Sequence, residues 1–162
     1  MFVLLRAVTW ATLFVGLVLI GIPARLLTAS GTGWPEAIGV SQAAGIPSIV
    51  TGAVLAVWCT FAFVFVGKGT PAPFDPPREL VVGGPYRFAR NPMYIGVATT
   101  LVGAALFYQS IALLCYAAAF ITLAHLFVVG YEEPALGRKF PHRYPVYCQK
   151  VGRWGLARRG TL

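Results

Sequence analysis

The chain has 162 residues, of which 57% are hydrophobic and only 11% are charged, and its formal net charge is +8. Soluble domains carry about 25% charged residues, so this composition excludes an ordinary soluble globule and favours a single membrane domain over residues 1–162. The basic residues lie between apolar runs rather than in one patch, which argues against a nucleic-acid partner.

Four apolar stretches are candidates for transmembrane helices, since about 20 residues cross the core of a bilayer. The first is predicted to be a retained span rather than a cleaved signal peptide, because no clear small-residue cleavage site follows it. A loop rich in glycine and proline is expected between residues 22 and 45, and Tyr108-Gln109-Ser110 separates the last two spans. The predicted spans cover about residues 7–27, 46–66, 93–108 and 110–130.

The positive charges orient these spans. With the N-terminus inside, Arg6, the loop 67–92 and the tail 131–162 face the cytoplasm and hold every lysine and arginine except Arg25. The sequence therefore predicts an all-α integral membrane protein of the cell inner membrane, with both termini cytoplasmic. We expect a bundle of four or five transmembrane helices with a cytoplasmic C-terminal amphipathic segment. The apolar residues of that segment recur at helical spacing: Phe140, Tyr144, Tyr147 and Val151.

A polar, turn-forming stretch from residue 83 to residue 94 leads into the third span. Gly83-Gly84-Pro85 marks a turn, and Pro92 suits the first position of a helix. A helix start exposes N–H groups and a positive dipole end, which attract carboxylates or phosphates. The side chains that add charge, rings and hydroxyls are Tyr86, Arg87, Arg90 and Tyr94. The stretch predicts either a ligand site or a juxtamembrane loop whose arginines contact lipid headgroups.

Two acids and a histidine lie at the end of the fourth span. Glu132 and Glu133 are costly so close to lipid unless they have partners, so we expect either basic residues of the tail or a bound cation beside them. His125 lies seven residues before Glu132, close to two helical turns, and is either a hydrogen-bonding group between helices or a functional residue. No metal site is predicted, because no histidines or cysteines stand at ligand spacing. An anion-binding helix start, aromatic walls and acids together fit a zwitterionic ligand with a sulfonium or amine centre.

Two motifs resemble those of a known family. The stretch GPYRFARNPMYIG, followed by YEEPALGRKFPHRYPVY, resembles the integral membrane methyltransferases of the isoprenylcysteine carboxyl methyltransferase and phospholipid methyltransferase group. The resemblance implies S-adenosyl-L-methionine as cofactor at the cytoplasmic mouth, and a hydrophobic acceptor that enters from the bilayer. The cofactor contacts that it implies are Leu80, Val81, Tyr86, Asn91, Pro92, Met93, Tyr94 and Glu132. Arg87 or Arg90 would meet the cofactor's carboxylate or an anionic head of the acceptor.

The chain departs from the family's pattern at three positions. Asn91 stands where a histidine is usual, Pro141 where a glycine is usual, and Val128 where an arginine associated with prenylated substrates is usual. The resemblance therefore leaves the acceptor open. A carboxylate acceptor needs no base, whereas an amine or hydroxyl needs one, for which His125 or Glu133 is the candidate.

The sequence thus predicts an S-adenosyl-L-methionine-dependent methyltransferase, with His125, Glu133 and Arg90 as its candidate catalytic residues. Its expected partners are membrane lipids and a hydrophobic small-molecule or lipidated acceptor. Two alternatives stay open. One is an NADPH-dependent membrane reductase of related fold, and the other is a non-catalytic membrane protein that binds lipid.

Overall fold

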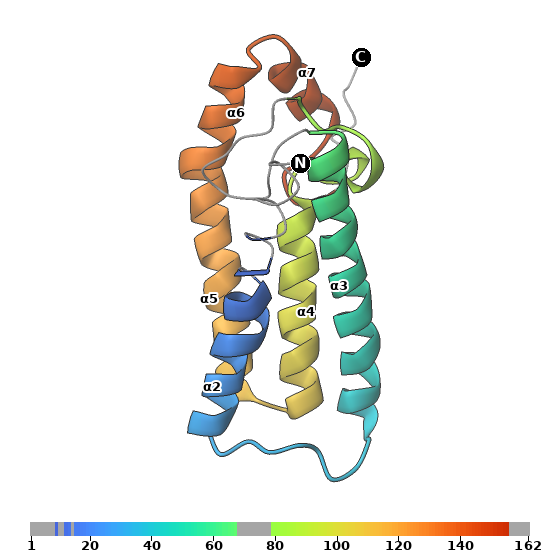
Figure 1. The fold of residues 1–162 in the computed structure, drawn as a ribbon, viewed down its shortest axis with the longest axis vertical. Helices are drawn as coiled ribbons and strands as arrows, with labels where there is room; N and C mark the ends of the chain where they lie inside the picture. Colours follow the sequence, from blue (N-terminus) through green and yellow to red (C-terminus); the bar gives the residue numbers. More distant parts are fainter. Residues whose placement is uncertain (1–8, 10–11, 14, 68–78, 156–162) are drawn as a thin grey trace.

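The computed structural model describes residues 9, 12–13, 15–67 and 79–155. In this part of the chain every regular element is helical, and the longer helices run side by side along the long axis of the molecule (Figure 1). Residues 7–8, 10–11 and 14 of the predicted first span lie outside the described residues, and so do residues 68–78 of the predicted loop 67–92. The elements are η1 (Val15–Gly21), α2 (Ile22–Ala29), α3 (Val40–Phe65), η2 (Gly84–Arg87), α4 (Pro92–Tyr108), α5 (Ile111–Phe127), η3 (Val128–Glu132), α6 (Glu133–Lys139) and α7 (Arg143–Lys150).

The two ends of the bundle have different contents (Figure 1). One end carries the connection from α2 to α3 and the tight turn from α4 to α5. The other end carries the segment that leads into α4, together with α6 and α7. Segments far apart in the sequence gather there, and so do the residues that the sequence analysis selected.

An apolar helix overlaps each of the four predicted spans. Two of them, α3 and the continuous helix Ile111–Lys139, are long and apolar enough to cross a membrane. The other two, Gly16–Ala29 and Pro92–Tyr108, are shorter apolar helices. Length and composition therefore support two spans, and a bundle of four or five remains a prediction.

The outer faces of these helices are apolar. Large side chains such as Val54 and Phe61 on α3, and Leu123 on α5, are more than half exposed. Soluble proteins rarely expose a continuous apolar surface, because its contact with water is unfavourable. The apolar faces therefore fit an integral membrane protein.

The first connection is shorter than the predicted loop over residues 22–45. α2 ends at Ala29 and α3 begins at Val40, so only residues 30–39 connect them. Pro23 follows the π-helical turn η1 inside the continuous helix Gly16–Ala29, and the wider turn accommodates the N–H group that proline lacks. At the start of α3, the Gln42 side-chain oxygen accepts a hydrogen bond from the Gly39 N–H (3.1 Å). The prediction was wrong here because glycine also occurs at helix starts and proline also occurs beside π turns within a helix.

α3 and α4 approach each other backbone to backbone. Gly45 and Gly52 of α3 face Gly103 and Gly96 of α4, in antiparallel order. A Cβ atom on Gly52 would lie 2.5 Å from the Gly96 carbonyl oxygen, and one on Gly96 would lie 2.7 Å from the Gly52 carbonyl oxygen. Small residues allow such close approach between membrane helices. This contact fixes the position of α4, whose first turn forms the site.

The turn between α4 and α5 lies at the predicted break. Gln109 has a left-handed backbone (φ 50°), the conformation that commonly ends a helix. The Ser110 hydroxyl then accepts a hydrogen bond from the Leu113 N–H (3.4 Å) and caps α5. The two helices are therefore antiparallel neighbours.

The long helix from Ile111 to Lys139 contains a π-helical turn, η3, at Val128–Glu132. Pro134 follows this turn, and a proline cannot donate to the carbonyl four residues earlier and clashes with it. The wider turn accommodates that proline, as helix irregularities commonly do. Because a π turn holds more residues than an α turn, it changes the direction in which Glu132 points relative to the residues before it.

The tail folds back over the end of the bundle. α7 and the residue after it bury Tyr144, Tyr147 and Val151 in one cluster with Leu80. Phe140 packs against the same cluster. The apolar face noted in the sequence is thus covered by protein along this part, while contact of the segment with the membrane surface stays a prediction.

Candidate functional site

The site is built around the start of α4. The short turn η2 leads into it, and Gly84 in this turn has a left-handed backbone (φ +59°) that a side chain would strain. Tyr86 is only 5% exposed, and its carbonyl accepts a hydrogen bond from the Tyr147 hydroxyl (2.6 Å). Burial raises the pKa of the Tyr86 and Tyr147 hydroxyls, so both remain protonated. The turn is therefore fastened to α7.

A short segment of the tail, Gly152–Trp154, crosses the start of α4, and we call it the strap. The Arg90 N–H donates to the Gly152 carbonyl (3.0 Å), and the Asn91 side-chain amide donates to the Arg153 carbonyl (3.2 Å). Asn91 is 6% exposed. Its amide therefore holds the strap against the first turn of α4.

Glu133 lies between two arginines. Arg153 donates to both carboxylate oxygens (2.7 Å each), and Arg90 Nη1 lies 3.1 Å from one of them. Bidentate arginine–carboxylate pairs are among the strongest hydrogen-bonded contacts in proteins, and this pair raises the pKa of Arg153. Arg90 Nη1 also donates to the Tyr144 hydroxyl (3.2 Å) and to the Cys148 sulfur (2.7 Å). The tail thus supplies a basic partner for Glu133, one of the two options that the sequence left open.

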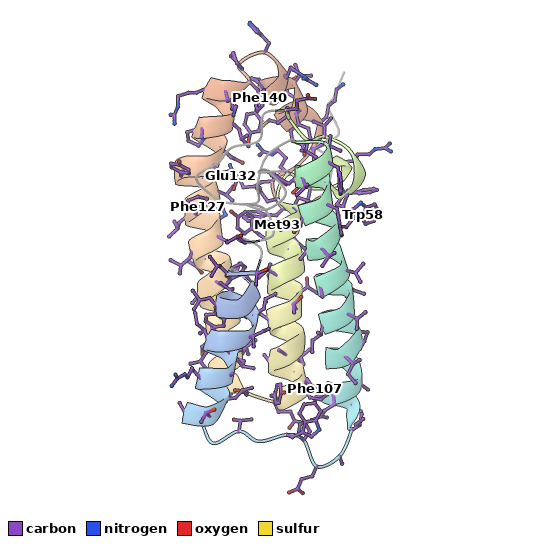
Figure 2. All side chains as sticks on the ribbon, in the orientation of Figure 1. Trp58, Met93, Phe107, Phe127, Glu132 and Phe140 are labelled. Atoms are coloured by element: carbon purple, nitrogen blue, oxygen red, sulfur yellow. The ribbon has the colours of Figure 1, made fainter. Side chains whose placement is uncertain are left out.

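Glu132 has a different environment from its neighbour. Its carboxylate accepts a hydrogen bond from the Tyr94 hydroxyl (3.1 Å), which joins the end of η3 to the first turns of α4. Among the described residues no lysine or arginine forms an ion pair with it. Glu132 and Met93 lie at the same end of the bundle (Figure 2). A partly buried carboxylate beside an apolar bundle favours a cation as its partner.

Two buried polar atoms at this end lack a well-formed hydrogen bond among the described residues: Arg90 Nε, and the Tyr86 hydroxyl, whose neighbouring polar group is the weakly bonding thiol of Cys59. Nine in ten or more buried polar groups are paired in native structures, so each such atom asks for an explanation. A polar ligand that reached both would supply the missing partners.

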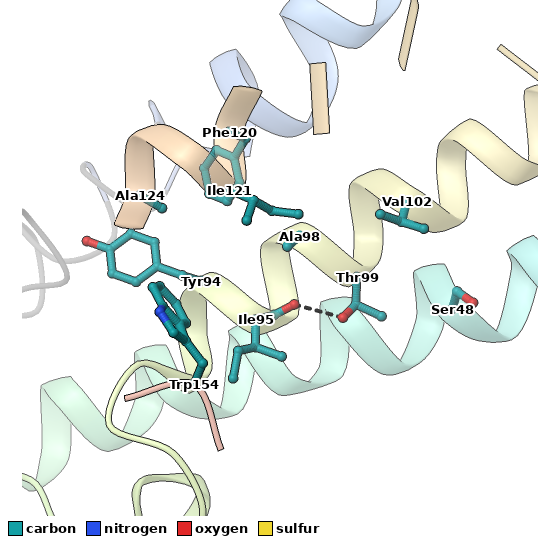
Figure 3. Close-up of a pocket in the computed structure, with 10 residues that line it drawn as sticks. All are labelled: Ser48, Tyr94, Ile95, Ala98, Thr99, Val102, Phe120, Ile121, Ala124 and Trp154. Atoms are coloured by element: carbon teal, nitrogen blue, oxygen red, sulfur yellow. Dashed lines mark hydrogen bonds between the residues drawn. The ribbon is translucent and has the colours of Figure 1, made fainter. Parts of the chain in front are cut away.

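An apolar pocket of about 390 Å³ lies along α4 and α5 (Figure 3). It runs from Tyr94 and Trp154 at one end to Val102 and Ser48 at the other (Figure 3). Its side walls come from the two helices: Ile95, Ala98, Thr99, Phe120, Ile121 and Ala124. Pockets for small ligands commonly enclose about 300–1,000 Å³ with few polar groups. Since Tyr94 also binds Glu132, the polar end of the pocket adjoins that carboxylate.

His125 lies on the exposed side of α5 and pairs with the strap. Its Nδ1 accepts a hydrogen bond from the Trp154 indole N–H (3.1 Å), and the two rings lie 6.0 Å apart. Of the two options for His125, the structure thus shows a hydrogen bond, made to the tail rather than to another span.

Most of the predicted site residues gather at this end. Leu80 is buried against the residues of α7, and Val81 is buried beside Tyr86. Met93 packs against the cluster that contains Val81 and Tyr86. Pro92 is the first residue of α4, as expected. Arg87 is exposed on η2 and forms no ion pair within the described chain. Their roles toward a ligand stay proposals.

Four further residues complete this arrangement: Tyr144, Cys148, Arg153 and Trp154. The sequence indicated Tyr144 only as part of the apolar face of the tail, and it marked none of the four as a site residue. Their contacts span 20 to 58 positions of sequence, from Arg153–Glu133 to Arg90–Cys148, so no local pattern marks them. The acid pair was the one available signal, because paired acids so close to lipid need partners, and basic residues of the tail were one of the two options. The described residues contain no group of three or more acidic, histidine or cysteine side chains that could hold a metal ion.

Comparison with known proteins identifies one family. The family model described as phospholipid methyltransferase matches residues 40–143, which is more than half of the chain. The matched region contains α3, α4, α5 and α6, and with them Tyr94, Glu132 and Glu133. No curated protein and no solved structure matches the chain significantly.

Proposed function

Because the chain belongs to the phospholipid methyltransferase family, we propose that it is a membrane methyltransferase that uses S-adenosyl-L-methionine. Its acceptor would be hydrophobic or lipid-like, with a carboxylate, amine or hydroxyl as the methylated group. One observation carries this proposal: Glu132, a carboxylate without a cationic partner among the described residues, adjoins the polar end of an apolar pocket through Tyr94. The family favours methyl transfer over the reductase alternative.

The residues at the start of α4 fit the cofactor's charges. S-adenosyl-L-methionine supplies a sulfonium-bound methyl group and carries a carboxylate and an adenosyl group. Glu132 would face the cationic part, and the unpaired Arg90 Nε–H is a suitable donor to the carboxylate. The buried Tyr86 hydroxyl offers a further hydrogen bond. The chain would thus bind and orient the methyl donor, which is where such a transfer gains most of its rate.

The apolar pocket would take the hydrocarbon part of the acceptor. Its walls are almost entirely apolar, and Ile121 is 46% exposed, so the pocket borders the outer surface of the bundle. A chain that lay along α4 would bring its polar head to Tyr94 and Trp154. In this arrangement the acceptor reaches the site from the bilayer, and its head meets the methyl donor beside Glu132.

The two candidate proton acceptors, Glu133 and His125, differ in whether arginine occupies their acceptor atoms. Both oxygens of Glu133 are engaged by arginine, so we assign Glu133 to positioning Arg90 and Arg153. His125 is then the group that would take a proton from an amine or hydroxyl acceptor. We further propose that the site faces the cytoplasm, with four spans and both termini inside, because the lysines and arginines of the described chain, Arg25 excepted, lie at this end.

Methyl transfer is tested directly with membranes from cells that express the protein. Incubation with S-adenosyl-L-methionine labelled with tritium in its methyl group should place radioactivity in the organic phase after lipid extraction. Glu132→Gln should reduce that incorporation to the level of membranes without the protein. Glu36→Gln serves as the matched control, because Glu36 is an exposed acid in the connection at the opposite end. Equal incorporation by both variants, or none with the unaltered protein, would contradict the proposal.

A further inference from the structure

Trp154 belongs to the pocket and to the strap at the same time. Its indole lines the polar end of the pocket beside Tyr94, with the two ring centres 6.5 Å apart and the planes at 72° (Figure 3). The same indole donates its only hydrogen bond to Nδ1 of His125 (3.1 Å). The indole therefore stands between α4 and the candidate proton acceptor on α5.

The strap holds the backbone of Trp154 in place while its side chain stays accessible. The preceding residue is tied by the Arg153–Glu133 pair and by the hydrogen bond from Asn91. The following residue, Gly155, has a left-handed backbone (φ +113°) that suits glycine. The Trp154 side chain itself is 38% exposed. It is thus positioned by one hydrogen bond and ring contacts, so a ligand at the end of the pocket could displace it.

The hydrogen bond also decides what His125 can do. A neutral imidazole carries one proton and one lone pair, on different nitrogens. An indole N–H only donates, so with Nδ1 accepting from Trp154 the ring proton of His125 is on Nε2. The lone pair that would take a proton is then occupied, and the imidazole is not available as a base.

We propose that Trp154 is a positioning residue that gates His125. While the indole is in place it covers the polar end of the pocket and occupies the Nδ1 lone pair. Entry of an amine or hydroxyl head moves the indole and frees Nδ1. The acceptor's nitrogen or oxygen would then use a lone pair to bond to the methyl group, while the electron pair of the broken carbon–sulfur bond stays on the donor's sulfur. As that bond forms, the acceptor's N–H or O–H bond breaks, its proton passes to Nδ1, and the electron pair of the N–H or O–H bond stays on the acceptor. The proposal rests on the proposed function for the identity of the acceptor step, but the hydrogen bond can be tested without it.

Nitrogen-15 NMR of the detergent-solubilised full chain measures the tautomer directly. The chain has two histidines, so His142→Gln assigns the two sets of signals. At a pH well above the ordinary histidine range, His125 should show one fixed tautomer, with the proton on Nε2. Trp154→Phe keeps an aromatic ring but removes the N–H, and should convert His125 to a mixture of the two tautomers. His142 should not change and serves as the internal control.

The second measurement adds oleylamine, an apolar chain with an amine head, to the micelles. It should shift the Trp154 indole N–H signal and release the fixed His125 tautomer, whereas hexadecane, which lacks the head, should release it much less. Identical His125 spectra for the unaltered protein and Trp154→Phe would overturn the proposal. A tautomer that stays fixed at saturating oleylamine would overturn it as well.

Failure of the gate and failure of the proposed function have different signatures. If the protein binds S-adenosylhomocysteine but the His125 tautomer is unchanged in Trp154→Phe, it would remain a methyltransferase without this gate. A protein whose His125 tautomer depends on Trp154 and responds to oleylamine, but which binds no S-adenosylhomocysteine, would retain the gate and lose the proposed methyl donor. Circular dichroism of each variant confirms that the helices are intact.

Discussion

The close contact between α3 and α4 gives the sharpest stability prediction, at Gly52. A Cβ atom on Gly52 would lie 2.5 Å from the Gly96 carbonyl oxygen and 2.6 Å from the Thr100 backbone nitrogen. Ordinary contacts of a Cβ atom begin near 3.4 Å, and backbone atoms of a packed helix cannot rotate away as a side chain can. Gly52→Ala therefore requires α3 and α4 to move apart along their contact.

The expected cost follows from this geometry. Overpacking a close contact costs about 1–3 kcal/mol. Alanine also gains about 1 kcal/mol over glycine in a helix, which offsets part of that cost. Gly130→Ala is the matched control, because Gly130 is helical and a Cβ atom there meets nothing within 4 Å. The difference between the two variants isolates the clash and should be about 1–3 kcal/mol.

Thermal unfolding in detergent, followed by circular dichroism, measures this difference. For a chain of this size each kcal/mol moves Tm by about 2–4 °C, so Gly52→Ala should unfold several degrees below Gly130→Ala. S-adenosylhomocysteine should also bind Gly52→Ala more weakly at temperatures where it is folded, since α4 carries the start of the site. Equal Tm values for the two variants would refute the backbone-to-backbone packing described here.

Three further changes test separate parts of the account. Arg153→Gln removes the bidentate pair with Glu133 and should lower the free energy of unfolding by about 1–2 kcal/mol. The loss is not larger because this charged pair is partly exposed to solvent. Denaturant titration measures it, with Arg138→Gln, at an exposed arginine, as the control. Tyr147→Phe should cost about 1 kcal/mol. Because burial raises the pKa of Tyr147, the folded protein keeps this proton after the unfolded chain loses it, so stability should fall as pH rises above about 10, and less steeply in the variant. Ala98→Phe fills the pocket and should leave S-adenosylhomocysteine affinity unchanged while methyl transfer to long-chain acceptors is lost.

Hydropathy predicted the helices well because membrane spans are long and uniform. Residues 46–66 and 93–108 lie within α3 and α4 almost completely, and the break at Gln109 was marked by polar residues. The start of α3 at Val40 was missed, because the glycines and prolines before it also occur in loops. The π turn at Val128–Glu132 carries no hydropathy signal, and only the proline after it hints at an irregular helix.

The site was predicted in part, and for a physical reason. Tyr94 and Glu132 each stood in a recognisable motif, and the structure joins them by a hydrogen bond. The sequence left open whether tail cations or a bound cation would pair with the two acids, and the structure divides them: Glu133 is held by arginines and Glu132 is not. The two acids differ because the strap contacts only Glu133, through Arg153, which is 20 residues away in the sequence. Another contact of the strap, from Trp154 to His125, spans 29 residues. Contacts of this range depend on how the tail folds back, which no local spacing reveals.

Binding of S-adenosylhomocysteine tests the central claim most directly. Calorimetric titration of the detergent-purified protein should give affinity in the micromolar range, with no heat from NADPH under the same conditions. Glu132→Gln should lose that affinity while keeping the helical circular dichroism of the unaltered protein, whereas Glu36→Gln should keep it. Binding of NADPH alone, or S-adenosylhomocysteine affinity that is the same with and without the Glu132 carboxylate, would contradict the account.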